Sequence, residues 1–246
     1  MAETTAHLVD QLIPRVAVCQ WVLSFPVALR ILFAAHPQLL SGVLHIIHRV
    51  IARFLIKQAG LKHGEADTGA VTLIQRFGSA ANLNIHLHCL VLDGVYQSSE
   101  GVPVFHEVGA PSIEQLQQLL NRIIARIMKW LTRAGYLIEE EGMTYLGEID
   151  AHSALMPLQA ASWTYRIAFG PRAGHKVLSL QTRPGRAAQP AQALCANAHG
   201  FSLHAGVRCG ADQRQALEQL CRYITPARPL PTNGSSATVL AKWCCS

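Results

Sequence analysis

The sequence lacks three features that would assign it to a familiar class of protein. Its seven cysteines never occur in a Cys-x-x-Cys spacing, so we expect reduced thiols and no zinc site within this chain. No apolar stretch is long enough to predict a membrane span, because histidine and arginine side chains interrupt residues 43–55. The first residues carry neither the basic stretch nor the apolar core of a signal peptide. We therefore expect a cytoplasmic protein without a membrane partner.

Acidic residues are scarce relative to basic ones. The chain has 15 Asp and Glu against 21 Lys and Arg, which gives a formal charge of +6 and a sequence pI near 9.1. This balance suits a polyanionic partner such as nucleic acid, although ordinary enzymes can be equally basic. Half of the 246 residues are hydrophobic, so the chain can build a substantial core.

Apolar periodicity predicts a mixture of strands and long helices. Strands are expected at residues 20–25, 69–77, 84–92, 162–169, 176–180 and 201–207, and helices at residues 27–35, 38–59, 113–134 and 211–223. The two kinds of element do not alternate regularly. We therefore predict an α+β fold with a mainly antiparallel sheet and flanking long helices.

The tripeptide formed by His86, Leu87 and His88 is the most informative local motif. Residues two apart on a strand point to the same side, so Asn84, His86 and His88 should share one face, with apolar neighbours on the other. Two adjacent imidazoles can chelate a divalent ion. The motif alone is weak, because about one such pair is expected by chance among twelve histidines, and a half-exposed strand with two ordinary histidines has the same pattern.

Basic side chains recur at helical spacing in both long predicted helices. The rows consist of His45, Arg49, Arg53 and Lys57 in the first, and Arg122, Arg126, Lys129 and Arg133 in the second. Such rows can contact a phosphate backbone, but they also occur on the solvated side of any amphipathic helix. His45 and His48 lie one turn apart and could chelate a metal, although a structural role is the more frequent one.

Four segments resemble, in the same order, the bacterial rolling-circle transposases of the insertion sequence ninety-one family. They read PRVAVCQWVLSFP (14–26), QRFGSAANLNIHLHCLVLDGVY (75–96), LQAASWTYRIAFGPRAGHKVL (158–178) and GFSLHAGVRCGADQRQALEQLCRY (200–223). The resemblance implies a transposase catalytic domain over residues 1–225, of the His-hydrophobic-His nuclease type. It also implies a sheet of the ferredoxin or RNA-recognition type, with the His pair on a central strand.

The same resemblance implies roles for individual residues. His86 and His88 would hold Mg²⁺ or Mn²⁺, and Tyr223 would attack single-stranded DNA at the element ends. We also expect Arg222, beside Tyr223 in the sequence, to contact DNA. The protein would then be bacterial, cytoplasmic and associated with the nucleoid through DNA. A phenol oxygen suits this reversible attack. The residues alone leave other tyrosines open as nucleophiles, namely Tyr96, Tyr136, Tyr145 and Tyr165, of which Tyr165 is predicted to lie in the core.

A third metal ligand is expected beyond the His pair. Alternation in residues 201–207 puts His204 on the polar face of its strand, so His204 is the leading candidate, as ligand or as support for one. Gln75 is a weaker candidate. Two-tyrosine relatives carry a second tyrosine one helical turn before the nucleophile; Gln219 stands there in this chain, which resembles the one-tyrosine branch.

The chain departs from the resemblance at both ends. Relatives carry a cysteine-rich zinc-binding segment before the stretch with which this chain begins, and residues 226–246 do not resemble their continuation. We predict that residues 226–246 are an out-of-frame, disordered tail and that the protein is truncated at both ends. One rival interpretation is a remnant that binds DNA without cleaving it. Another, a small-molecule metalloenzyme of sandwich type, is disfavoured by the two long helices.

Overall fold

The structure is a computed structural model that describes residues 7–77, 83–97, 102–140, 143–146, 194–224 and 239–244. Its helices are η1 (Leu8–Leu12, a turn of π-helix), α2 (Val27–Ala35), α3 (Leu39–Gln58), α4 (Ile113–Arg133) and α6 (Arg214–Ile224). Its strands are β1 (Val18–Ser24), β2 (Ala66–Phe77), β3 (Leu83–Leu92), β4 (Gly94–Gln97), β5 (Val104–Glu107), β6 (Leu137–Glu140), β7 (Met143–Leu146), β8 (Cys195–Ala198), β9 (Phe201–Cys209) and β10 (Val239–Cys244).

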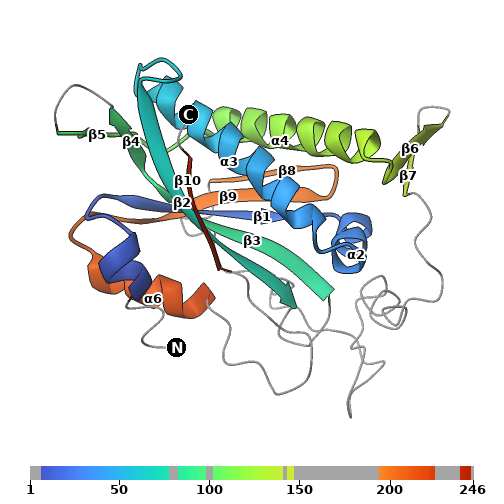
Figure 1. Ribbon diagram of the computed structural model, residues 1–246, viewed down its shortest axis with the longest axis horizontal. Coiled ribbons are helices and arrows are strands. Elements are labelled where there is room, and N and C mark those ends of the chain that lie inside the picture. Colours follow the sequence, from blue (N-terminus) through green and yellow to red (C-terminus); the bar gives the residue numbers. More distant parts are fainter. Residues whose placement is uncertain are drawn as a thin grey trace, which may run out of the picture.

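One large sheet organises these elements (Figure 1). Its strand order is β5-β4-β2-β3-β1-β9-β8, with β10 added to β2, and every pair of strands is antiparallel. Within it, the connection β1-α3-β2-β3-α4-β9 and the order β2-β3-β1-β9 are those of a ferredoxin-like βαββαβ unit. The predicted α+β fold with a mainly antiparallel sheet is confirmed, and β3 is a central strand.

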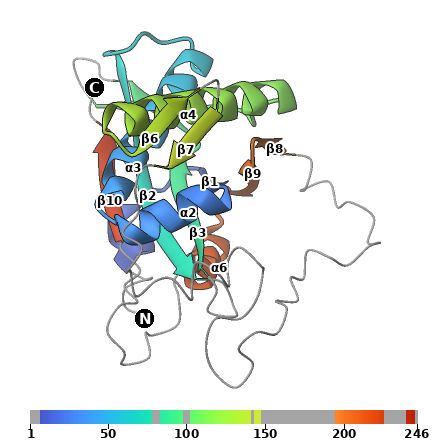
Figure 2. The same cartoon turned by 90° about the vertical axis from the view of Figure 1, so that its right-hand side faces the viewer.

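The apolar side of the sheet is covered by α2, α3 and α4. Trp21 and Leu23 on β1 and Leu87 on β3 are almost fully buried in the main core together with residues of these helices. The alternation of the strands sends the intervening residues to the opposite side. Figures 1 and 2 show α3 and α4 on one side of the sheet and α6 on the other.

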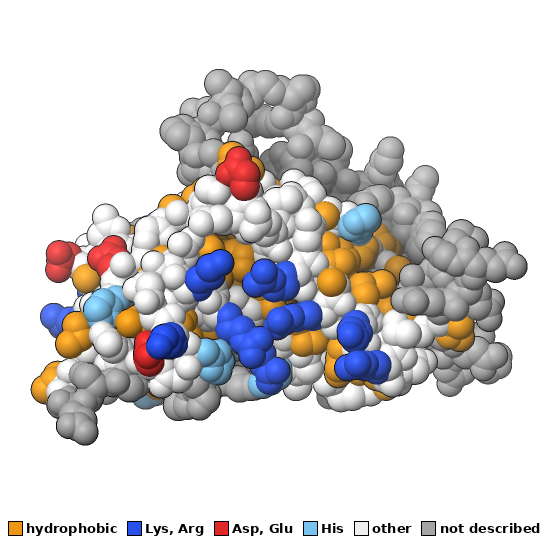
Figure 3. All heavy atoms as spheres, turned by 90° about the horizontal axis from the view of Figure 1, so that it is seen from above, with side chains coloured by type: hydrophobic (Ala, Val, Ile, Leu, Met, Phe, Trp, Pro, Cys, Tyr) orange, Lys and Arg blue, Asp and Glu red, His pale blue; other side chains and the backbone are white. Residues whose placement is uncertain are grey.

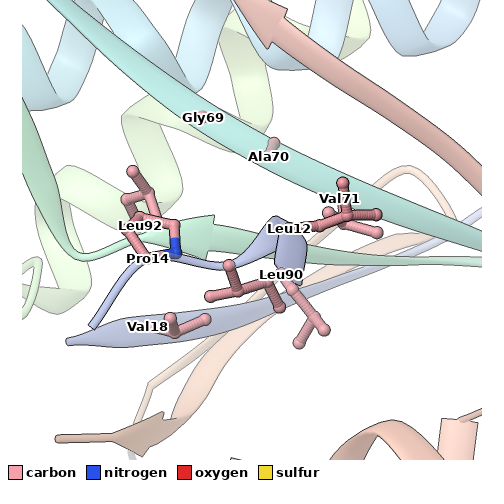
Figure 4. A pocket seen from close by; sticks show the side chains of 9 residues that line it. Leu12, Pro14, Val18, Gly69, Ala70, Val71, Leu90 and Leu92 are labelled. Atoms are coloured by element: carbon pink, nitrogen blue, oxygen red, sulfur yellow. The ribbon is translucent and has the colours of Figure 1, made fainter. Parts of the chain in front are cut away.

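The opposite side of the sheet has a second, smaller core at one end. There α6 and η1 bury Leu217, Cys221 and Leu8 against Leu90 and Leu73 of the sheet. A pocket between η1 and the sheet has only apolar side chains in its lining, among them Leu12, Val18 and Leu92 (Figure 4). It offers packing surface but no polar side chain for chemistry.

The two long helices begin and end where the sequence predicts. Ser112 caps α4 in a capping box, in which its hydroxyl accepts a hydrogen bond from the backbone N–H of Gln115 and the Gln115 side chain accepts one from the Ser112 N–H. Gly135 and Gly60 follow α4 and α3 with φ values of 79° and 75°, which glycine adopts without strain. By length and composition α3 could cross a membrane, but its apolar residues are buried against the sheet.

Several elements differ from the sequence-based expectation. The short strands β4, β5 and β8 and the turn η1 were not predicted, because four or five residues give too little periodicity. Residues 239–244, inside the tail predicted at residues 226–246, form β10, which pairs with β2 from Val239↔Leu73 to Cys244↔Thr68. The β-favouring run there adds to the edge that β2 leaves open. The strands predicted at residues 162–169 and 176–180 lie outside the described residues.

Candidate active site

His86 and His88 are two positions apart on β3 and lie on its polar side. In the register of the sheet, Ser24 of β1 and Gln75 of β2 stand opposite His86. A hydrogen bond of 2.8 Å joins Ser24 Oγ to His86 Nδ1. Among the described residues, no hydrogen bond engages Nε2 of His86, so this nitrogen can still accept a ligand bond.

His88 is held from both sides by amide side chains. The Nε2 amide of Gln20 lies 3.0 Å from His88 Nδ1, and His88 Nε2 lies 3.0 Å from Gln75 Oε1. An amide N–H donates, so this pattern makes Nδ1 the acceptor and puts the ring proton on Nε2, from which it is donated to Gln75. Gln20 and Ser24 are four positions apart on β1 and so point to the same side of the sheet. This alternation was visible in the sequence, but Gln20 was not predicted as a site residue.

Both imidazoles are held in the neutral form. Burial, the positive charge of Arg30 and the proximity of His88 lower the pKa of His86 from 6.5 to about 4, and burial lowers the pKa of His88. A neutral imidazole has the lone pair that metal coordination requires, whereas a protonated one repels a cation. Nε2 of the neutral His86 therefore has an open lone pair, whereas both ring nitrogens of His88 are hydrogen-bonded.

Arg30 brings a cation to the edge of this site, and nothing in the sequence singled it out. From α2, its Nη1 donates to Asn84 Oδ1 at 2.7 Å and its Nε donates to the Phe25 carbonyl at 2.5 Å. Asn84 shares the polar side of β3 with His86. A guanidinium fixed in this way can pair with a phosphate oxygen bound beside the histidines.

Tyr223 projects from the last turn of the helix that covers the same side of the sheet. Leu217, Cys221 and Ile224 form the buried stripe of α6, and Tyr223 points away from it with 86% of its surface exposed. The neighbouring Arg222, predicted to contact DNA, forms a salt bridge of 2.6 Å with Glu218. The phenol is thus open to an incoming strand.

The other tyrosines that the structure describes are packed against rings. Tyr96 lies 5.0 Å from the Phe105 ring and Tyr136 lies 5.0 Å from His36, measured between ring centroids. Tyr165 and the side chain of Tyr145 lie outside the described part of the chain.

His204 shares the polar side of the sheet but is not brought together with the His pair. Val22 of β1 stands between them in register, opposite both His88 and His204. Two strand spacings separate the backbones by about 10 Å. Within the described residues, no three His, Cys, Asp or Glu side chains are grouped closely enough to hold a metal. Of the two candidates for a third ligand, Gln75 on β2 is the one that contacts the pair, through His88.

The two rings of the second histidine pair, His45 and His48, have different partners. His48 is buried and its Nε2 lies 2.7 Å from Thr72 Oγ1, whereas His45 is exposed and hydrogen-bonded to Arg49. The two rings therefore face different surroundings.

The predicted DNA-binding arginines fall into two separate places. Arg222 is on α6, beside Tyr223. The other five of the six predicted contacts lie on α3 and α4, the helices that cover the apolar side of the sheet, away from the His pair; they are Arg49, Arg53, Arg122, Arg126 and Arg133. Arg222 and the five arginines of α3 and α4 therefore lie on opposite sides of the sheet.

Comparison with known proteins assigns a family. Residues 69–229 match the family described as "Putative transposase". This range includes most of β2 and all of β3, α4, β9 and α6, and with them the His pair and Tyr223. No curated protein and no solved structure matches the chain. Since the match spans well over half of the sequence, the chain belongs to this transposase family.

Proposed function

We propose that the chain is a rolling-circle transposase of the insertion sequence ninety-one type, which nicks single-stranded DNA and transfers the strand through a 5′-phosphotyrosine. The observation that carries the proposal is a shared sheet face. The neutral His86 and His88 lie on the polar side of the central strand, and the exposed Tyr223 comes from α6, which packs on the same side. Membership of a transposase family supports the same activity.

The residues fit a divalent metal ion such as Mg²⁺ or Mn²⁺. His86 Nε2 is available, and its Nδ1–H can donate to Ser24 in the way that metal-bound histidines are oriented. His88 would ligate through Nε2 once the Gln20 amide turned its oxygen toward Nδ1, and Gln75 Oε1 is then positioned as an oxygen ligand. The ion, when bound, would polarise the scissile phosphate.

The chain's own side chains would perform the transfer. The Tyr223 phenol oxygen attacks the scissile phosphorus, and its proton passes to solvent. The new O–P bond forms as the bond from phosphorus to the 3′ oxygen breaks, and that oxygen takes up a proton to become a 3′-OH. Arg30 would offset charge on the phosphate oxygens. A 3′-OH of another strand can then attack the phosphotyrosine and release the tyrosine.

The first prediction concerns this covalent intermediate. We expect the wild-type protein, incubated with a single-stranded element end and Mn²⁺, to form a DNA adduct that survives denaturing electrophoresis. Tyr223→Phe should form none, because it lacks the attacking oxygen, and it should melt like wild type, because Tyr223 is 86% exposed. His86→Ala and His88→Ala should also lose the adduct while keeping most single-strand affinity.

Tyr136→Phe is the matched control, since its ring packs against His36 and the hydroxyl has no part in the proposal. An adduct that persists in Tyr223→Phe would contradict the role of Tyr223. DNA binding without an adduct in wild type, with either Mg²⁺ or Mn²⁺, would instead favour a remnant that binds DNA but does not cleave it.

A further inference from the structure

Helices α3 and α4 together present a continuous cationic surface, which we call the basic helix surface. It consists of Arg49, Arg53 and Lys57 from α3 and Arg122, Arg126, Lys129 and Arg133 from α4. All are exposed except Arg126, which is half-buried. Figure 3 looks onto this side of the molecule and shows Lys and Arg side chains gathered over its middle.

The two helices hold these charges close together. Gly42 of α3 lies directly against the Trp130 ring of α4, so the two helices approach closely there. Burial and the positive charges of Arg53, Arg122 and Arg49 lower the pKa of Arg126, which indicates that the four guanidinium groups are neighbours.

No carboxylate compensates this concentration of charge. The sequences of α3 and α4 contain one acidic residue, Glu114, in the first turn of α4. Within the described residues, none of the seven cations forms an ion pair with a carboxylate. Seven cations held together against their mutual repulsion create a strong positive potential. Such a potential attracts a polyanion.

The basic helix surface lies on the far side of the sheet from the His pair. Leu23 and Leu87, which pack beneath α3 and α4, point to the opposite side from Ser24 and His86. A strand cut at the histidines therefore cannot place the same phosphates on the basic helix surface. The two surfaces must bind different stretches of nucleic acid.

The chemistry of the surface favours a duplex over a single strand. Proteins that hold single strands stack the bases on exposed aromatic rings. The aromatic side chains of α3 and α4, Phe54 and Trp130, are instead packed against the core. Arginine and lysine rows without such rings contact phosphates and leave the bases paired.

We propose that the basic helix surface binds the phosphate backbone of duplex DNA, at a second site separate from the His pair. The claim that the other side of the sheet binds the cleaved strand rests on the function proposed above. The duplex site does not depend on that function. Such a site would hold the double-stranded flank of an element while its single-stranded end is cut.

The test compares two variants with four substitutions each. In the first, Arg49, Arg53, Arg122 and Arg126 become Gln; in the second they become Lys, which keeps the charge. Binding of a blunt 24-base-pair duplex is measured by fluorescence anisotropy from low to moderate salt. The Gln variant should lose at least about tenfold in affinity, and the slope of log affinity against log salt should flatten by about 3 to 4, at about 0.9 per lost phosphate contact. The Lys variant should bind nearly as wild type.

Adduct formation on a short single-stranded oligonucleotide is measured in parallel, and unchanged circular dichroism checks the fold. The Gln variant should form this adduct at the wild-type rate. Unchanged duplex affinity and salt slope in the Gln variant would overturn the proposal. The proposal would also be overturned if the basic helix surface of the wild-type protein bound a single strand as tightly as the duplex. It would be overturned as well if the Gln variant lost the oligonucleotide adduct but kept duplex binding. If wild type forms no adduct, the proposed function fails, and the duplex titration still decides this inference.

Discussion

His86 couples the stability of the protein to pH. Burial, Arg30 and His88 lower its pKa from 6.5 to about 4, so the unfolded chain binds the proton more tightly than the folded one. The free energy of unfolding should therefore be highest above pH 6.5 and should fall as the pH is lowered toward 4. A shift of this size corresponds to at most about 3–4 kcal/mol, at about 1.36 kcal/mol per pKa unit.

Urea unfolding in EDTA between pH 7 and pH 4 measures this dependence. We expect His86→Gln to reduce the loss of stability over this range, because the titrating group is gone. His63→Gln, at an exposed histidine, is the matched control and should keep the wild-type dependence. Identical pH dependence in His86→Gln and wild type would show that His86 is not held neutral by the fold.

Arg30 should affect both the histidine and the chemistry. Arg30→Gln removes a positive charge that opposes protonation of His86, so the pKa of His86 should rise, although burial should keep it below 6.5. NMR titration of the His86 ring measures this shift. Adduct formation should slow by roughly 100- to 1,000-fold, as for the loss of one donor that stabilises an oxyanion. Arg30→Lys, which keeps the charge, should keep the lowered pKa; an unchanged pKa in Arg30→Gln would separate Arg30 from the site.

At the scale of elements, the contact between α3 and α4 depends on the absence of a side chain at Gly42. A Cβ there would lie 2.7 Å from Cη2 of Trp130, closer than real contacts allow. Gly42→Ala should therefore destabilise the protein by about 1–3 kcal/mol, despite the higher helix propensity of alanine. Urea unfolding measures the loss.

Two further variants separate this clash from a general helix effect. Ser41→Ala changes an exposed neighbour in the same helix and should not destabilise the protein. Replacing Trp130 by Leu should cost less in the Gly42→Ala background than in wild type, because the smaller side chain relieves the clash. Equal costs in the two backgrounds would contradict the close approach of α3 and α4.

At the scale of the whole molecule, a partly buried ion pair links the ends of β3 and β9, the two strands that pair with β1. Arg208 of β9 binds the carboxylate of Asp93, which follows β3, and their side chains are 28% and 6% exposed. Burial raises the pKa of Asp93 even with Arg208 beside it, so the pair does not fully offset the loss of hydration.

Removal of one partner should therefore cost more than removal of both. Arg208→Met should lower the free energy of unfolding at pH 7 by about 2–3 kcal/mol, because it leaves a buried carboxylate without its cation. Asp93→Asn combined with Arg208→Met should cost less than the sum of the single changes, which a double-mutant cycle in urea measures. Additive costs would mean that the pair does not interact.

Much of the fold could be predicted from local sequence. Helix α2 was predicted at its exact bounds, and α3 and α4 to within one residue at each end, because apolar spacing, the Ser112 cap and the glycines that follow act within a few residues. The ferredoxin-like sheet was expected only from the resemblance. The short strands β4, β5 and β8 were missed, because they depend on neighbours distant in the sequence.

The candidate site divides in the same way. Two-residue alternation by itself determined that Asn84, His86 and His88 share one side of a strand, and the helical repeat determined the basic rows. Only the tertiary structure decided that Gln20, Ser24 and Gln75 hold the histidines, that Arg30 lies beside them, and that α6 covers the same side of the sheet. It also decided that the basic rows join on the opposite side. The reason is physical: periodicity fixes the side to which a residue points, whereas strand register and helix packing fix which residues meet.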